Sequence, residues 1–76
     1  MTPIKVNCGN GGDYEFERDR HLWKLWIKQH ITNTEPFVVK PAEEADKALV
    51  IFEAERYNTI FLLKAPEYIS WRMVKE

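Results

Sequence analysis

The stretch that decides the fold is residues 48–55, which read ALVIFEAE. Its first five residues are apolar without interruption, so both faces of a strand built from them would be buried. A strand with one face in water would show a polar side chain at every second position, and this stretch does so only near its end. The pattern therefore predicts a central strand with a neighbouring strand on each side.

The residues that follow predict further strands of the same sheet. Residues 56–58 are expected to form a tight turn, because Asn58 tolerates a left-handed backbone. Residues 59–63 are then expected to return as a second strand. After a turn at residues 65–68, residues 69–75 alternate apolar and polar side chains, with Ile69, Trp71 and Met73 on one face. These three strands predict an antiparallel meander.

A long amphipathic helix is predicted upstream, over residues 14–31. Apolar side chains recur there at the three- and four-residue spacing of one helix face. Asp13 is expected to cap the helix. We interpret the apolar face as core, and it carries Phe16, Trp23, Trp26, Ile27, His30 and Ile31.

Two shorter elements are predicted between the long helix and the central strand. Residues 37–39 are expected to form a short strand. Residues 41–47 are expected to form a short acidic helix, because Pro41 suits the first helical position and acidic side chains suit the first turn. Residues 1–12 are expected to be a flexible segment or to hold a short strand at Ile4, and residues 13–76 to form a single domain.

These elements predict an α+β fold. We expect an antiparallel sheet of three to five strands, with one long amphipathic helix and the short acidic helix packed on it. A length of 76 residues allows one domain and one core. A hydrophobic content of 45% and an aromatic content of 13% exclude a disordered chain.

The composition excludes several classes of function. Cys8 is the single cysteine, so the chain has no internal disulfide, and with two His residues it makes no zinc cluster without several carboxylates. A lone thiol suits a reducing cytoplasm, and the apolar runs are too short to cross a membrane. We therefore expect a cytoplasmic protein with no metal, no cofactor and no membrane partner.

The sequence also lacks a catalytic constellation. There is no nucleophile elbow, no nucleotide-binding loop and no Cys/His pair at a known spacing. Glu43 and Glu44 are neighbours, and neighbours on a helix point in different directions, so they make a poor acid–base pair. We expect no enzyme and no catalytic residues.

Charge is unevenly distributed along the chain. The net charge is −1, which does not favour direct binding to nucleic acid. Residues 35–55 nevertheless hold four more acids than bases, with Lys40 and Lys47 set against Glu35, Glu43, Glu44, Asp46, Glu53 and Glu55. The residues alone therefore predict a small protein-binding domain with an acidic middle.

The C-terminal stretch of residues 62–74, LLKAPEYISWRMV, resembles the bacteriophage uracil-DNA glycosylase inhibitor family. Members of that family carry a Leu-Leu pair, then Ala-Pro-Glu-Tyr, then a Trp and a Val. The predicted order of helix, short strand, acidic helix and meander is also similar, so the resemblance covers about residues 28–74. It implies a one-to-one complex with uracil-DNA glycosylase, in which a DNA mimic that is monomeric when free fills the enzyme's groove inside an infected host cell.

The resemblance also implies roles for particular residues. Glu35 would enter the groove, with Pro36 and Phe37 beside it. Glu43 and Asp46 would stand in for DNA phosphates, with Glu44 as a substitute. A pocket would take an apolar side chain of the enzyme, and it would be lined by Val39, Val50, Phe61, Leu63 and Val74.

A second hypothesis stays open at this point. The small size, the lone cysteine and the many aromatic residues suit equally a phage-type interaction module, anti-defence or regulatory, that binds a different host protein. Loss of uracil excision would favour the first hypothesis, and capture of another partner would favour the second.

Overall fold

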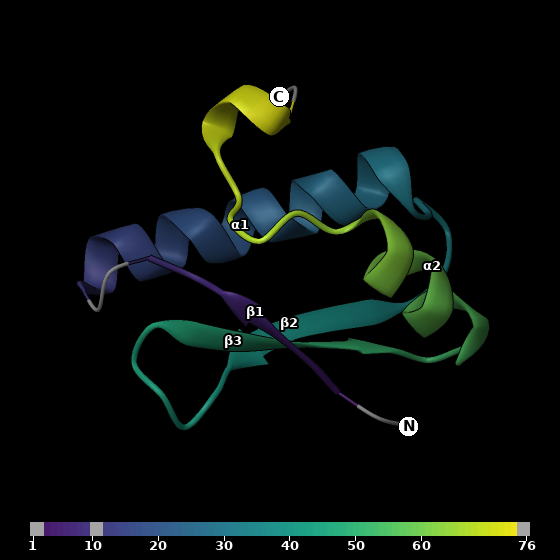
Figure 1. Ribbon diagram of the computed structural model, residues 1–76, viewed down its shortest axis with the longest axis horizontal. Helices are drawn as coiled ribbons and strands as arrows, with labels where there is room; N and C mark the ends of the chain where they lie inside the picture. Colours follow the sequence, from purple (N-terminus) through teal and green to yellow (C-terminus); the bar gives the residue numbers. More distant parts are fainter. Residues whose placement is uncertain (1–2, 10–11, 75–76) are drawn as a thin grey trace.

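The computed structural model describes residues 3–9 and 12–74. Along the chain, the elements are β1 (Ile4–Asn7), α1 (Asp13–His30), β2 (Phe37–Pro41), β3 (Lys47–Phe52), α2 (Arg56–Lys64) and a 3₁₀ turn, η1 (Trp71–Met73) (Figure 1).

The three strands form one antiparallel sheet with β3 at its centre. Val50 on β3 pairs with Ile4 on β1 and with Val39 on β2. The prediction of a central strand is confirmed, although β3 runs from Lys47 to Phe52. Because β1 and β2 both run antiparallel to β3, they are parallel to each other, and α1 connects them as a split βαβ unit.

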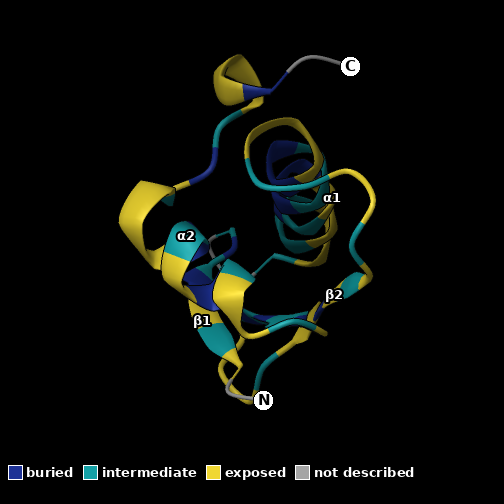
Figure 2. Ribbon diagram, turned by 90° about the vertical axis from the view of Figure 1, so that its right-hand side faces the viewer, coloured by how far each residue is buried: buried dark blue, intermediate teal, exposed yellow. Residues whose placement is uncertain are grey.

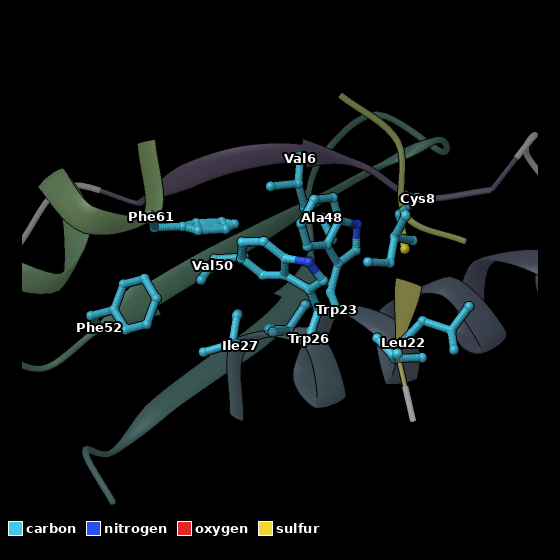
Figure 3. Packing of buried hydrophobic residues seen from close by; sticks show 13 residues of the cluster. Val6, Cys8, Leu22, Trp23, Trp26, Ile27, Ala48, Val50, Phe52 and Phe61 are labelled. Carbon is cyan, nitrogen blue, oxygen red and sulfur yellow. The ribbon is translucent and has the colours of Figure 1, made fainter. Parts of the chain in front are cut away.

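Both helices cover the same face of the sheet (Figures 1 and 2). The core between these two layers is largely aromatic. The ring centroid of Phe61 lies 5.6 Å from that of Trp23, 5.7 Å from that of Trp26 and 5.8 Å from that of Phe52. Figure 3 shows these side chains meeting from α1, α2 and β3. Phe61 therefore joins both helices to the sheet.

The long helix was predicted nearly correctly. It runs from Asp13 to His30, and Trp23 and Trp26 are buried as expected. The predicted cap is wrong: Gly12 occupies the N-cap position, Asp13 is the first helical residue, and no side chain caps the helix. His30 is exposed, with its ring centroid 5.0 Å from that of Trp26.

The joint between β1 and α1 requires a glycine. Gly9 has a φ of +80°, and a Cβ placed there would lie 2.9 Å from the backbone nitrogen of Phe16. The N–H of Gly9 donates to the buried carboxylate of Asp19 at 2.8 Å. The indole N–H of Trp23 donates to the carbonyl of Asn7, also at 2.8 Å. These contacts fix α1 against β1, which is the short strand expected near Ile4.

The predicted short acidic helix at residues 41–47 is wrong. Those residues end β2, turn and begin β3, with the N–H of Ala42 donating to the carbonyl of Lys47 at 3.1 Å. Paired residues alternate between bonded and non-bonded positions in an antiparallel ladder, so the next pair, Pro41 and Ala48, is non-bonded. Pro41 thus occupies an edge strand at a position that needs no N–H, and strand pairing takes precedence over its helix-starting preference.

The predicted turn and return strand at residues 56–63 are also wrong, because this segment is helix α2. A short apolar run such as residues 60–63 does not distinguish a strand from a helix. Helical spacing directs Tyr57, Asn58 and Phe61 inward, since residues three and four apart share a face. Leu62 and Leu63 consequently face water.

The predicted last strand and the meander are absent from the described residues. Ile69 is buried, but Trp71 is 67% exposed and Met73 is 43% exposed, so they share no buried face. Residues 71–73 form η1 instead, and the N–H of Arg72 donates to Ser70 Oγ at 3.3 Å. The α+β class is confirmed with a sheet of three strands, while residue 75 lies outside the described part of the chain.

The packing predicts that truncating two aromatic side chains changes the free energy of unfolding by very different amounts. Phe61→Ala is expected to lower the free energy of unfolding by about 3–5 kcal/mol, because it empties the centre of the core. Trp71→Ala is expected to change it by less than about 0.5 kcal/mol, because its ring is exposed. Urea denaturation of both variants measures the difference. A large loss for Trp71→Ala would show that its ring packs in the core.

Candidate functional site

Acidic side chains from two separate elements meet at one end of the molecule. The loop between β2 and β3 and the beginning of α1 lie side by side there (Figure 1). They enclose an open hollow of about 290 Å³ with Asp13, Glu17 and Glu44 among its lining residues. The rest of its lining is mainly apolar and consists of Phe16, Pro41, Ala42 and Ala45. We name this region the acidic end: Asp13, Glu17, Glu43, Glu44 and Asp46.

Three of these five carboxylates form ion pairs. Lys5 Nζ lies 2.7 Å from Glu44 Oε1, and Lys47 Nζ lies 3.2 Å from Asp46 Oδ2. Arg20 Nη2 lies 2.7 Å from Glu17 Oε2. The hydrogen bond and charge of Glu44 raise the pKa of Lys5, and Glu43 adds to this effect. Exposed pairs of this kind contribute little to stability, so a cationic partner can displace them.

Asp13 and Glu43 differ from the other three acids. Neither forms an ion pair with any residue in the ranges 3–9 and 12–74. Both side chains are exposed, one on the first turn of α1 and one in the hairpin loop. They are therefore the carboxylates of the acidic end that are most accessible to a partner.

The fourth predicted acid, Glu35, is not part of this group. Its N–H donates to Thr32 Oγ1 at 3.2 Å, before β2 begins. The hairpin loop follows the other end of β2, so about 25 Å of extended chain separates Glu35 from Glu43. Near Glu35, the neighbours Pro36 and Phe37 line a shallow hollow of about 230 Å³ with Val38, Ile51 and Glu53. The structure thus places the predicted groove-binding residues in two separate groups.

The five residues of the predicted apolar pocket do not line a common hollow. Val39, Val50, Phe61 and Val74 are buried, and Leu63 is 82% exposed. The space between helix and sheet near Phe61 is occupied by Trp23, Trp26 and Phe52 (Figure 3). Four of the five residues therefore belong to the core or its margin.

Sequence reasoning missed a second exposed surface near the C-terminus. Seven large hydrophobic residues are exposed in the described part of the chain, and five of them are Leu62, Leu63, Tyr68, Trp71 and Met73. The adjacent leucines give the only signal in the sequence, because two neighbours on a helix do not both face the core. We name residues 65–74 the C-terminal strap.

The lone thiol is not a candidate nucleophile. Cys8 is fully buried, and its Sγ–H donates to the carbonyl of Phe16 at 3.2 Å. Burial raises the pKa of this thiol to about 12, and the charge of Asp19 adds to the shift. A thiol with so high a pKa stays protonated at neutral pH and is unreactive.

The described residues also lack a metal centre or a membrane span. No group of three or more His, Cys, Asp or Glu side chains within residues 3–9 and 12–74 is placed to hold a metal ion. None of the helices described here has the length and apolar character needed to cross a membrane.

Comparison with protein-family models, with curated proteins and with solved structures gave no match to this chain. The features of this chain that bear on its function are therefore the acidic end, the C-terminal strap and the sequence resemblance.

The pKa of Cys8 predicts a pH dependence of stability. The pKa of Cys8 is about 12 in the folded protein, above the ordinary value of 9.0. The contribution of the protonated, buried thiol to the free energy of unfolding is therefore complete below about pH 9. It is lost as the pH rises from 9 toward 12, because the unfolded thiol ionises first. Urea denaturation between pH 8 and pH 11 measures this. The free energy of unfolding is expected to decline less over that range for Cys8→Ala than for the wild type. Equal declines would contradict the burial of the thiol.

Proposed function

We propose that this domain binds another protein and acts as a DNA mimic, presenting its acidic end to the basic groove of a DNA-processing enzyme. The observation that carries the proposal is the convergence of carboxylates from the β2–β3 loop and the first turns of α1 around one hollow. Uracil-DNA glycosylase is the first candidate target, because residues 62–74 resemble its phage inhibitors.

The electrostatics of such a groove suit the acidic end. DNA-binding grooves are lined with Lys, Arg and backbone N–H groups placed for phosphates. The unpaired carboxylates of Asp13 and Glu43 offer charge to that lining directly. Glu44 and Asp46 are held in place by Lys5 and Lys47, and groove cations would compete for them. Charge complementarity of this kind accelerates association and makes it sensitive to salt.

The contact geometry differs from the one that the resemblance implies. A hairpin loop and a helix N-terminus carry the acids here, in place of a short acidic helix. Asp13 and Glu17 join Glu43, Glu44 and Asp46 in the proposed contact, while Glu35, Pro36 and Phe37 lie at the far end of β2. The proposal also includes the stoichiometry and the location that the resemblance implies. The domain is monomeric when free and binds the enzyme one to one in the cytoplasm of an infected host cell.

A second candidate function is supported by the exposed apolar side chains of α2 and the strap. Leu62, Leu63 and Trp71 lie outside the acidic end and are at least 67% exposed. Exposed apolar residues in such a concentration are typical of protein-binding surfaces. An interaction module for a different host protein would use them.

The test is uracil excision by a bacterial and a human uracil-DNA glycosylase, with the purified domain titrated in. We expect stoichiometric loss of activity in at least one of the two. The double variant Asp13→Lys, Glu43→Lys is expected to weaken inhibition by roughly tenfold or more, because it reverses two unpaired charges in the proposed contact.

The matched control is Glu35→Lys, Glu53→Lys, which makes the same charge change at the far end of β2. It is expected to keep near wild-type inhibition. Loss of inhibition in this variant alone would assign the contact to Glu35 and overturn the acidic end as the binding surface. Full enzyme activity at a large excess of the wild-type domain would exclude the tested glycosylases as targets.

A further inference from the structure

The C-terminal strap is fixed to the body of the domain, although it holds only a short 3₁₀ turn. It runs from the end of α2 past β1 and along the flank of α1, and only η1 lies beyond α1 on the side away from the sheet (Figures 1 and 2). Ile69 and Val74 are at most 9% exposed and anchor it. Asn7 Nδ2 also donates to the carbonyl of Glu67 at 2.9 Å. The exposure of Trp71 between these anchors is therefore a property of the folded domain.

Trp71 and Arg72 form a stacked pair on this strap. The guanidinium carbon of Arg72 lies 5.5 Å from the ring centroid of Trp71. A guanidinium stacked on an aromatic ring keeps its in-plane N–H donors available for a carboxylate. Trp and Arg are also the residue types that contribute most to binding energy in protein interfaces.

A hollow adjoins this pair. It has a volume of about 420 Å³ and is lined by Gln29 and His30 at the end of α1 and by Arg72, Met73 and Val74 on the strap. This volume lies near the lower end of the range for ligand sites. It has room for more than one side chain of a partner, with Met73 and Val74 as its apolar lining and Arg72 as its charged group.

The charges around the strap are mainly positive. Lys28, Lys64 and Arg72 are exposed, and none of them forms an ion pair with a residue that the structure describes. Residues 56–74 contain a single acid, Glu67. Charge complementarity therefore favours an acidic occupant.

We propose that the C-terminal strap and the end of α1 form a docking surface for an acidic peptide segment of another protein. A carboxylate of that segment binds Arg72, and a neighbouring apolar side chain enters the hollow and packs on Met73 and Val74. The surface differs from the acidic end in place and in sign of charge, so the proposal does not depend on glycosylase inhibition.

The experiment is a selection from a random peptide library on the wild-type domain, with counter-selection on the variant Trp71→Ala, Arg72→Glu. We expect peptides in which Asp or Glu stands beside Leu, Ile, Phe or Trp. Binding is expected to change the fluorescence of Trp71, the exposed tryptophan. Titration should show that Arg72→Glu weakens binding by roughly tenfold or more, equivalent to about 1.4 kcal/mol.

Arg56→Glu is the matched control. Arg56 is also stacked on a ring, with its guanidinium carbon 5.1 Å from the ring centroid of Tyr57, but it lies at the start of α2. This variant is expected to bind the selected peptides as the wild type does. Circular dichroism of all variants verifies that the fold is retained, and Arg72→Glu is expected to leave any glycosylase inhibition unchanged.

Three outcomes would overturn the proposal. The first is a selection that yields basic peptides, or none that depend on Trp71 and Arg72. The second is equal loss of binding in Arg56→Glu and Arg72→Glu. The third is tighter binding of a single-stranded oligonucleotide or an anionic phospholipid vesicle through the same two residues, which would assign the surface to nucleic acid or to membrane.

Discussion

The packing of Phe61 against Trp23, Trp26 and Phe52 is the interaction on which the rest of the structure depends. The apolar face of a sheet must be buried against another layer, and the two helices form that layer here. Here one ring from α2 contacts α1 and the central strand together. Aromatic pairs of this geometry contribute about 0.5–1.5 kcal/mol each beyond the area they bury. Because this cluster holds α2 in place, it also sets where the strap begins.

The sequence alone predicted correctly the elements whose apolar pattern is long or unbroken, which are α1 and β3. The helical spacing of Trp23, Trp26 and Ile27 predicts a helix, and the β-branched residues within the apolar run of β3 favour a strand. The prediction failed at residues 41–47, where strand pairing took precedence over the helix-starting preference of Pro41, and again after residue 55, because four apolar residues at 60–63 suit a strand and a helix alike. The alternation at residues 69–73 is coincidental, since only Ile69 of the three apolar residues is buried. Glu43, Glu44 and Asp46 were predicted as site residues, but their proximity to Asp13 and Glu17 arises from tertiary contact and left no trace in the sequence.

The net charge of −1 is unevenly distributed over the structure. Acids gather at the start of α1 and in the hairpin loop, and unpaired cations gather at the end of α1, on α2 and on the strap. These two regions are about the length of α1 apart, roughly 27 Å at 1.5 Å per residue. A partner with one sign of charge would therefore orient the domain before contact. Exposed aromatic residues accompany both regions, with Tyr14 beside Asp13 on α1 and with Tyr68 and Trp71 on the strap.

The position of Pro41 has a consequence for how this protein associates. An open sheet edge can recruit a strand from another chain, and this route leads readily to aggregation. On β2, the backbone position that faces outward at residue 41 has no N–H to offer, and Lys40 beside it is exposed. On β1, the carbonyl of Asn7 is already occupied by the indole of Trp23. Each margin of the sheet therefore lacks one backbone group that a foreign strand would need, so adding a strand at either margin would cost one ladder hydrogen bond.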